Sequence, residues 1–435
     1  MKPTQNISLN RLGLRHLNLS YPTCIYLLLT TFIFLNPFPR ITAIKEIVFY
    51  TAVLLVIISI VKHKVKISFR SFLTSPFLFF TAWTMVGLFF SLDRTNSLHA
   101  FYSHLIKYML FYYILINYFK TKDHLYQLSV AIIVSATLFS VVSLIFFYGV
   151  NNFPLNTRFG ITFKNCATNV MGFNTVFAML LSLFMVQKKP DPKIGIPFFA
   201  CALILFAASV LTQSRGTILS IAASLPLIFI HKINFRTTIL AFVLIFLALI
   251  PLKNRLFELN LPENSNNVRM AITLFSFEII KDHPVFGTGF DTDTLKNKSL
   301  IDPNIYLPRI SEPYRKIFKT QEYILPHSML LSIAVRLGLV GLGLYLWILG
   351  ATTVVLIKLI CHGRDEEIKT WARYILAAFT MFFFKGLVEP VSTHFCEVIF
   401  HTILGMATIL WKINENSEST HLYTRNCRTK GSPLT

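Results

Sequence analysis

The sequence has little charge for its length. Asp, Glu, Lys and Arg make up 14% of its 435 residues, whereas hydrophobic residues make up 54% and Phe alone occurs 42 times. A water-soluble domain of this length needs far more charge to cover its surface. The low charge therefore excludes a soluble globular protein and indicates a protein embedded in a membrane. The apolar runs are long and do not alternate, which excludes the strands of a transmembrane barrel, about 9–11 residues each.

The sequence is also poor in cysteine and contains no CxxC pair. Its six cysteines are far apart, and four of them fall in or beside apolar runs; they are Cys24, Cys166, Cys201, Cys361, Cys396 and Cys427. Neither a disulfide framework nor a zinc site is indicated by such spacing. We therefore expect no metal and no cofactor.

The apolar runs predict an all-α, polytopic membrane protein with about twelve transmembrane helices and one large periplasmic loop. Runs of roughly 16–25 residues are long enough for a helix to cross the hydrocarbon core of a bilayer. The expected spans are roughly 22–39, 44–61, 72–91, 100–118, 125–149, 168–186, 194–212, 216–230, 237–252, 338–360, 371–387 and 393–411.

The formal net charge of +21 could suggest a nucleic-acid partner, but the positions of the positive residues do not. Lys and Arg concentrate in alternate short loops, as they do on the cytoplasmic side of membrane proteins; examples are Lys62, Lys64, Lys66 and Arg70, then Lys188, Lys189 and Lys193. We therefore expect no nucleic-acid partner and two cytoplasmic termini. The basic segment Met1–Ser20 is expected to precede an uncleaved first helix, because no persuasive cleavage site follows it.

The chain divides at its one long polar insertion. The expected parts are a nine-span membrane part (1–252), a periplasmic loop subdomain (253–325), a three-span membrane part (326–411) and a cytoplasmic tail (412–435), expected to be disordered. Within the insertion, the pattern of residues 268–281 predicts a helix with Asn266 or Asn267 as its N-cap. This helix is so apolar that we expect it to pack on the membrane domain or to lie at the membrane–water interface. The segment 291–324 is irregular and is expected to form a shaped lid.

Three charged or titratable side chains are expected at the outer rim of the membrane. Arg215 lies in a very short turn between two spans, where a permanent charge is costly unless it meets an anion or snorkels to headgroups. Arg269 is expected in the first turn of its helix, where it could share one phosphate with backbone N–H groups or be simply exposed. His327 is expected to open a helix, as a general base or in a structural role.

Other ionisable residues are weaker candidates. Arg158 and Lys164 could extend an anion-binding surface. Lys107 and Lys385 lie inside predicted spans, where a buried charge is costly and a lysine is therefore first taken to have a functional role. Lys385 could instead extend its ammonium group to the membrane surface.

The next candidates are expected to lie outside the site. Arg336, nine positions after His327, should face away from it on a regular helix. His394 and His401 are expected to pack between helices.

Four stretches, in this order, resemble the O-antigen ligase and polymerase-like superfamily of bacterial envelope glycosyltransferases. They are Arg158-Phe-Gly, Gln213-Ser-Arg-Gly, Val268-Arg269 leading to Lys281-Asp-His-Pro-Val-Phe-Gly-Thr-Gly289, and Pro326-His-Ser with Gly338-Leu-Val-Gly341. Each stretch is weak by itself, whereas the ordered set is fairly specific. Many members carry an acidic residue where this chain has Arg336, so a role for that carboxylate does not transfer. Glu322 or Glu389 could replace it.

The resemblance implies a metal-independent, inverting transfer of a glycan from undecaprenyl pyrophosphate to a sugar hydroxyl of lipid A–core, at the periplasmic face. By resemblance, His327 matches the general base, and Arg215 and Arg269 match the arginines that hold the pyrophosphate. The alternatives within the superfamily are an O-antigen polymerase and a protein O-oligosaccharyltransferase. A flippase for lipid-linked oligosaccharides is the alternative from another class, but it should have symmetric halves with broken helices at matching positions.

Overall fold

The computed structural model describes residues 20–63, 65–154, 157–159, 168–188, 191–229, 265–318, 325–389, 391 and 393–429. Within these residues the protein contains helices and connecting loops but no strand, which confirms the all-helical class. The predicted span 237–252 lies outside the described residues, as do Lys164 and Glu322.

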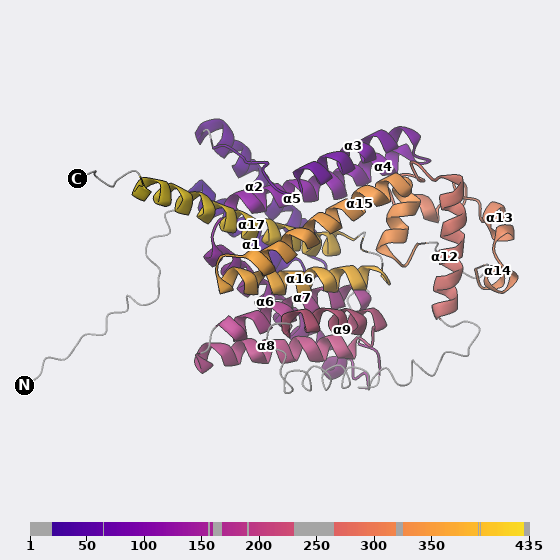
Figure 1. Cartoon of the computed structure of the whole chain (residues 1–435). Coiled ribbons are helices and arrows are strands. Elements are labelled where there is room, and N and C mark those ends of the chain that lie inside the picture. The colour runs from indigo at the N-terminus through magenta and orange to yellow at the C-terminus, as the bar shows by residue number, and fades with distance from the viewer. Residues whose placement is uncertain are drawn as a thin grey trace, which may run out of the picture.

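Most of the helices of the bundle belong to two groups in the sequence, one before and one after the long insertion. Their bounds are α1 Tyr21–Leu35, α2 Thr42–His63, α3 Thr74–Phe90, α4 Arg94–Ala100 with η1 Phe101–Ile106 and α5 Lys107–Tyr118, α6 Lys122–Leu144 with η2 Ile145–Val150, α7 Thr168–Lys188, α8 Pro192–Leu211, α9 Arg215–Phe229, α15 Met329–His362, α16 Glu366–Gly386 and α17 His394–Thr429. Each predicted span other than 237–252 coincides with a helix in this series. Helices α1 to α9 and α15 to α17 lie together in one bundle (Figure 1).

Six helices are long and apolar enough to cross a membrane, and three shorter ones are apolar as well. This supports a helical membrane protein, while the total of twelve spans stays a prediction. Helix α2 exposes an apolar surface of the kind that faces lipid. Its most exposed large side chains recur at intervals of three and four residues and form one stripe: Ile44, Ile47, Tyr50, Leu54, Ile57 and Val61. In water such a stripe would be unfavourable, whereas in a bilayer it faces lipid.

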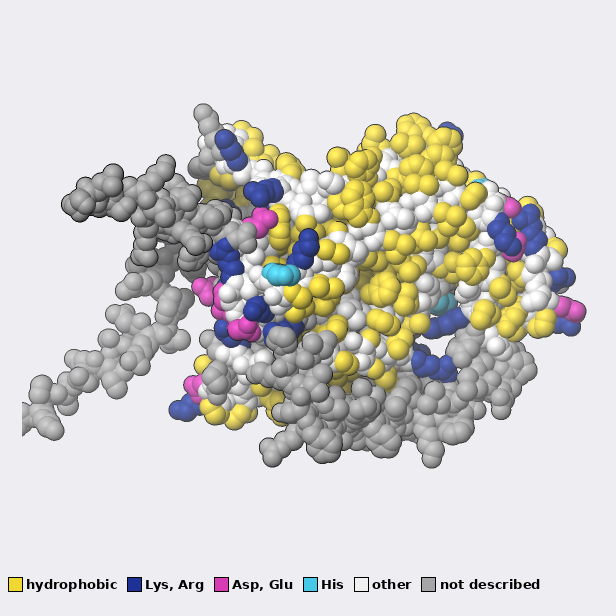
Figure 2. All heavy atoms as spheres, in the orientation of Figure 1, with side chains coloured by type: hydrophobic (Ala, Val, Ile, Leu, Met, Phe, Trp, Pro, Cys, Tyr) yellow, Lys and Arg dark blue, Asp and Glu magenta, His cyan; other side chains and the backbone are white. Residues whose placement is uncertain are grey.

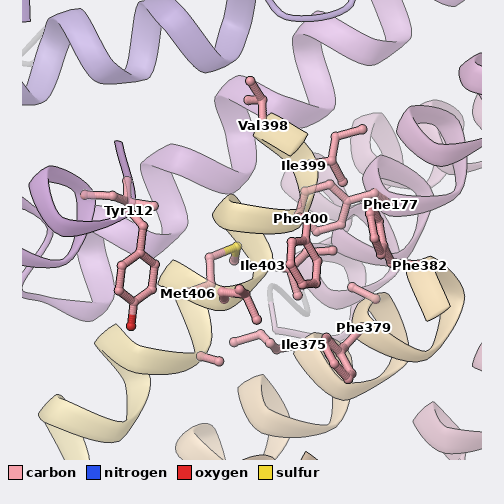
Figure 3. Packing of buried hydrophobic residues seen from close by; sticks show 14 of the residues in the cluster. Tyr112, Phe177, Ile375, Phe379, Phe382, Val398, Ile399, Phe400, Ile403 and Met406 are labelled. Atoms are coloured by element: carbon pink, nitrogen blue, oxygen red, sulfur yellow. The ribbon is translucent and has the colours of Figure 1, made fainter. Parts of the chain in front are cut away.

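Helices α7 and α17 form the centre of the bundle. In the membrane-length windows of both, 78% of residues are buried, against 22% for α2. Side chains of α17 such as Phe400 and Ile403 pack toward Phe382 of α16 and Phe177 of α7 (Figure 3). The first turns of α17, from Cys396 on, therefore lie in the core, which anchors the end of the segment between α16 and α17.

The insertion forms a small helical subdomain at one end of the bundle (Figure 1). It contains α12 Ser265–Asp282, η5 Asp293–Lys296, α13 Pro303–Tyr306, η6 Leu307–Arg309 and α14 Glu312–Phe318. The apolar face of α12 packs against this irregular segment and against the start of α15, through Phe275, Tyr306 and Val335 among others. The expected packing of α12 on the membrane helices is thus confirmed at α15. The periplasmic location of the subdomain stays a prediction.

Two local predictions are wrong. Helix α12 begins at Ser265, so Asn266 and Asn267 lie inside its first turn and neither precedes it as a cap. The tail after residue 411 was expected to be disordered, but α17 continues to Thr429. No Gly or Pro occurs in the tail before Gly431, so nothing in its backbone chemistry stops the helix earlier.

Candidate active site

A kink in α15 determines where His327 lies. Gly338 has φ 70° and ψ −175°, so the helix is interrupted there and its first segment runs from Met329 to Leu337. A side chain is excluded at this position, because a Cβ on Gly338 would lie 2.0 Å from the carbonyl oxygen of Val285. The span predicted to start at 338 therefore starts with the second half of a broken helix.

The turn after α12 satisfies the backbone groups that the kink exposes. The amide of Leu339 donates to the Pro284 carbonyl at 2.7 Å, and the amides of Thr288 and Gly289 donate to the carbonyls of Val335 and Arg336 at 2.9 and 3.0 Å. Buried polar groups of the main chain must find such partners. The two glycine-containing stretches noted in the sequence are thus the two halves of one contact, which joins the loop subdomain to α15.

Arg336 completes this contact. Its Nε donates to the carbonyl oxygen of Phe290 at 2.7 Å, and its guanidinium lies 4.7 Å from the centre of the Phe290 ring. The residue is 6% exposed. Arg336 therefore holds the turn in place, and its hydrogen bonds are made away from His327.

His327 lies in the segment before α15, whose N-cap is Ser328. Its Nδ1 atom is buried and has no hydrogen-bond partner among the described residues. Burial lowers the pKa of the imidazole from its ordinary value of 6.5, the positive charge of Arg269 lowers it further, and Glu389 opposes both. His327 is consequently neutral at pH 7, with a ring nitrogen that can accept a proton.

Arg269 reaches the loop that follows α16. Its Nη2 lies 3.1 Å from Oε1 of Glu389, and its Nη1 donates to the Val388 carbonyl at 3.2 Å. Because α12 begins at Ser265, Arg269 is the fifth residue of the helix, so the expected first-turn position is wrong. The carboxylate of Glu389 is the charge partner of the Arg269 guanidinium.

Arg215 approaches the same loop from the other side. It is the first residue of α9, and the next residue, Gly216, packs so closely that an added Cβ would lie 2.6 Å from Cγ2 of Val388 and 3.8 Å from Cγ of Glu389. The segment Val388–Glu389 therefore lies between the start of α9 and Arg269. His327, Arg215 and Arg269, which are far apart in the sequence, are all positioned around it.

The two secondary candidates, Arg158 and Lys385, make different contacts beside the segment Val388–Glu389. Arg158 donates from Nε to the Thr212 carbonyl at 3.0 Å, just before α9. Lys385 is fully buried, donates from Nζ to Oγ1 of Thr217 at 2.9 Å, and lies 5.0 Å from the Phe173 ring centre. The ammonium group of Lys385 thus joins α16 to α9 and α7, and it does not snorkel to an outer surface.

Glu389 was named from the sequence only as one possible substitute for a missing acidic residue. It is 5% exposed, and through its ion pair with Arg269 it joins the loop subdomain to the end of α16. A signal was available: a lone carboxylate directly after an apolar span is costly unless it is paired. Its partner, 120 positions earlier, could not be read from spacing.

A second titratable cluster lies at the start of α17. The rings of His104 and His394 stack at 4.1 Å between centroids with planes 11° apart; Nδ1 of His104 lies 3.0 Å from Oε1 of Glu397, and the Tyr108 hydroxyl pairs with Nδ1 of His394 at 2.9 Å. The three possible ligand groups lie within 4.8 Å of one another. However, parallel stacked imidazoles cannot both point an in-plane lone pair at one ion without turning. The hydrogen bonds account for this cluster as a link between helices, the role expected of His394.

Comparison with known proteins places these residues in a family. Residues 199–346, about a third of the chain, match the family model described as O-Antigen ligase. No curated protein matches the chain. The matched region runs from α8 to α15 and includes Arg215, Arg269 and His327, whereas Arg158 and Glu389 lie outside it. The match supports the resemblance noted in the sequence: residues 199–346 are similar to the O-antigen ligase family, and the apolar helices indicate a membrane protein.

Proposed function

We propose that the protein transfers a glycan from undecaprenyl pyrophosphate to a sugar hydroxyl of lipid A–core, at the periplasmic face of the inner membrane, as an O-antigen ligase. One observation carries the proposal. A neutral imidazole, whose buried Nδ1 has no partner in the part of the chain that the structure describes, lies near an arginine–carboxylate pair, and a second arginine begins α9.

The imidazole of His327 is the proton acceptor in this proposal. It takes the proton of the acceptor hydroxyl as the hydroxyl oxygen attacks the anomeric carbon of the donor sugar. The bond from that carbon to the pyrophosphate oxygen breaks, and its electron pair leaves with the pyrophosphate. A single displacement of this kind inverts the anomeric centre. General-base catalysis of this type contributes about 10²–10⁴-fold to the rate.

The arginines neutralise the leaving group. Arg269 uses two of its N–H groups on Val388 and Glu389, and its side chain is 36% exposed, so the guanidinium can still meet an anion that arrives from outside. Arg215 begins α9, where the helix dipole also favours negative charge. Two such cations do the work that a divalent ion does in other glycosyltransferases, which supports a metal-independent reaction.

The test is a transfer assay with purified protein, undecaprenyl-pyrophosphate glycan and lipid A–core in the presence of a chelator. We expect glycan on lipid A–core with the wild-type protein and none with His327→Ala. Loss of activity in the chelator would contradict the metal-independent mechanism. Longer lipid-linked glycans in place of modified lipid A–core would replace the ligase by a polymerase.

A further inference from the structure

A cavity of about 380 Å³ lies at the end of the bundle opposite the loop subdomain. It is formed by the segment before α3, the end of α5 and the link to α6, and the late part of α17. The lining residues on the first two are Lys66, Ser68, Arg70, Ile116, Asn117, Phe119 and Lys120, and those on α17 are Ile409, Trp411, Lys412 and Glu415. This end of the molecule is the one predicted to be cytoplasmic.

The cavity carries an excess of positive charge. Four of its lining residues are cations and one is a carboxylate, which leaves three formal positive charges (four minus one). Glu415 lies 3.0 Å from Nη2 of Arg70. Lys66, Lys120 and Lys412 have no ion pair in the part of the chain that the structure describes, and Lys412 donates to the Ile116 carbonyl at 3.3 Å. Figure 2 shows Lys and Arg side chains gathered at this end.

Hydrogen bonds hold the walls of the cavity together. Asn117, which is 9% exposed, accepts from the Ser68 amide at 2.8 Å and donates to the Ser68 carbonyl at 2.9 Å. Tyr112 joins the same segment to α17, because its hydroxyl lies 2.5 Å from that of Ser71 and 2.7 Å from that of Thr408. A loop that is fixed to two helices keeps its cations near one another, at an electrostatic cost that a bound anion would remove.

The other wall of the cavity is apolar. Ile116, Phe119, Ile409 and Trp411 contribute it, and Trp411 lies edge-on to Phe72 with the Arg70 guanidinium 6.0 Å from its ring centre. Tryptophan is favoured at the level of lipid headgroups, where one side of the ring is apolar and the other is wet. A site with cations on one side and apolar side chains on the other suits a molecule that carries both a phosphate and a hydrocarbon part.

We propose that this cavity binds the phosphate group of an anionic phospholipid from the predicted cytoplasmic leaflet, with Lys66, Lys120 and Lys412 around the phosphate and the apolar wall against the glycerol and upper acyl chain. Basic pockets between membrane helices bind anionic headgroups in this way. A solvated basic face would account for the charges alone, but not for the cavity with its apolar wall. This site is independent of the glycosyl-transfer site, since it lies at the other end of α17.

The test uses the full-length protein in a neutral detergent. Bound lipid is counted by native mass spectrometry, and the shift of the unfolding temperature is titrated with phosphatidylglycerol, phosphatidylcholine or inorganic phosphate. The variant is Lys66→Gln with Lys120→Gln. The matched control is Lys193→Gln with Lys358→Gln, because both of these lysines are exposed, lie at the same end, and are outside the cavity. Lys66→Arg with Lys120→Arg tests whether charge is what matters.

We expect wild type, control and arginine variant to bind phosphatidylglycerol with preference over phosphatidylcholine, and the glutamine variant to bind it at least about tenfold more weakly. Glutamine-variant binding equal to wild type would overturn the site, as would equal binding of phosphatidylcholine. A saturable shift of the unfolding temperature with inorganic phosphate, and none with phosphatidylglycerol, would overturn the proposal that the ligand is a lipid and would identify a soluble phosphate as the ligand.

Discussion

Two histidine-containing clusters lie near the short segment between α16 and α17. They differ in whether the ring nitrogens of their histidines have hydrogen-bond partners. At the start of α17, His394 pairs with Tyr108 and His104 pairs with Glu397. Before α15, the Nδ1 atom of His327 is buried and unpartnered among the described residues. Buried polar groups normally find partners. One oxygen of Glu397 is also buried without a partner among these residues, so the contrast concerns the imidazoles: Nδ1 of His104 and of His394 are both paired, whereas Nδ1 of His327 is not. The histidines at the start of α17 therefore link helices, whereas His327 is the imidazole that we propose for chemistry.

The largest expected effect separates the two clusters directly. His327→Gln should lower the rate of glycan transfer by about 10²–10⁴-fold, because the proton acceptor is lost. His394→Gln should leave the rate within about threefold, since that histidine only links helices. The measurement is the initial rate of transfer with both variants at matched amounts of folded protein, checked by size-exclusion chromatography. Equal losses in the two variants would end the distinction between the clusters.

The next effect tests the ion pair beside His327. Arg269→Gln should lower the transfer rate by about 10²-fold or more, as expected for the loss of one charge-stabilising group. Glu389→Gln should cost only about tenfold, because its amide oxygen can still accept from Arg269. The matched control is Arg309→Gln, which breaks the exposed pair of Arg309 with Asp282 and should not change the rate. A control that falls as far as Arg269→Gln would indicate a general effect of charge loss in the subdomain.

A smaller effect concerns the backbone that positions His327. Gly338→Ala should destabilise the protein by about 3 kcal/mol, because alanine does not tolerate φ 70° with ψ −175° and its Cβ would meet the Val285 carbonyl. Gly343→Ala on the same helix is the control, since nothing lies within 4 Å of its added Cβ. Thermal unfolding in detergent measures both. If the two variants melt together, the turn at 284–289 does not hold the kink.

The smallest effect is a shift in pH dependence. Since burial and Arg269 lower the pKa of His327 below 6.5, kcat/KM should be constant near pH 7 and fall only as the pH drops through that lowered pKa. Glu389 raises the pKa, so Glu389→Gln should move the acid limb to lower pH. Arg269→Gln, which removes a positive charge, should move it to higher pH. A rate profile in which the two variants shift in the same direction would contradict the assignment of the limb to His327.

Much of the site could be predicted from the sequence, and the reasons for the misses are local. Arg215, Arg269 and His327 were proposed because charge beside an apolar run is costly and therefore conspicuous, and their roles stay a prediction. Arg269 was predicted to lie in the first helical turn because the helix was predicted to begin at Val268, three residues after the observed start at Ser265. Lys385 could not be assigned, since an intramembrane lysine looks the same whether its ammonium meets a substrate or the hydroxyl of Thr217.

The sequence by itself determined that the chain forms apolar helices of membrane length and that its cations gather at particular loops, because both follow from the order of residues along one segment. Only the tertiary structure decided which of those cations share a site. Arg269 and Glu389 are 120 positions apart and meet because α12 packs on α15 while α16 and α17 fix the loop between them. Hydrophobic patterning is a property of neighbours in sequence, whereas charge pairing at this distance depends on how helices pack in space.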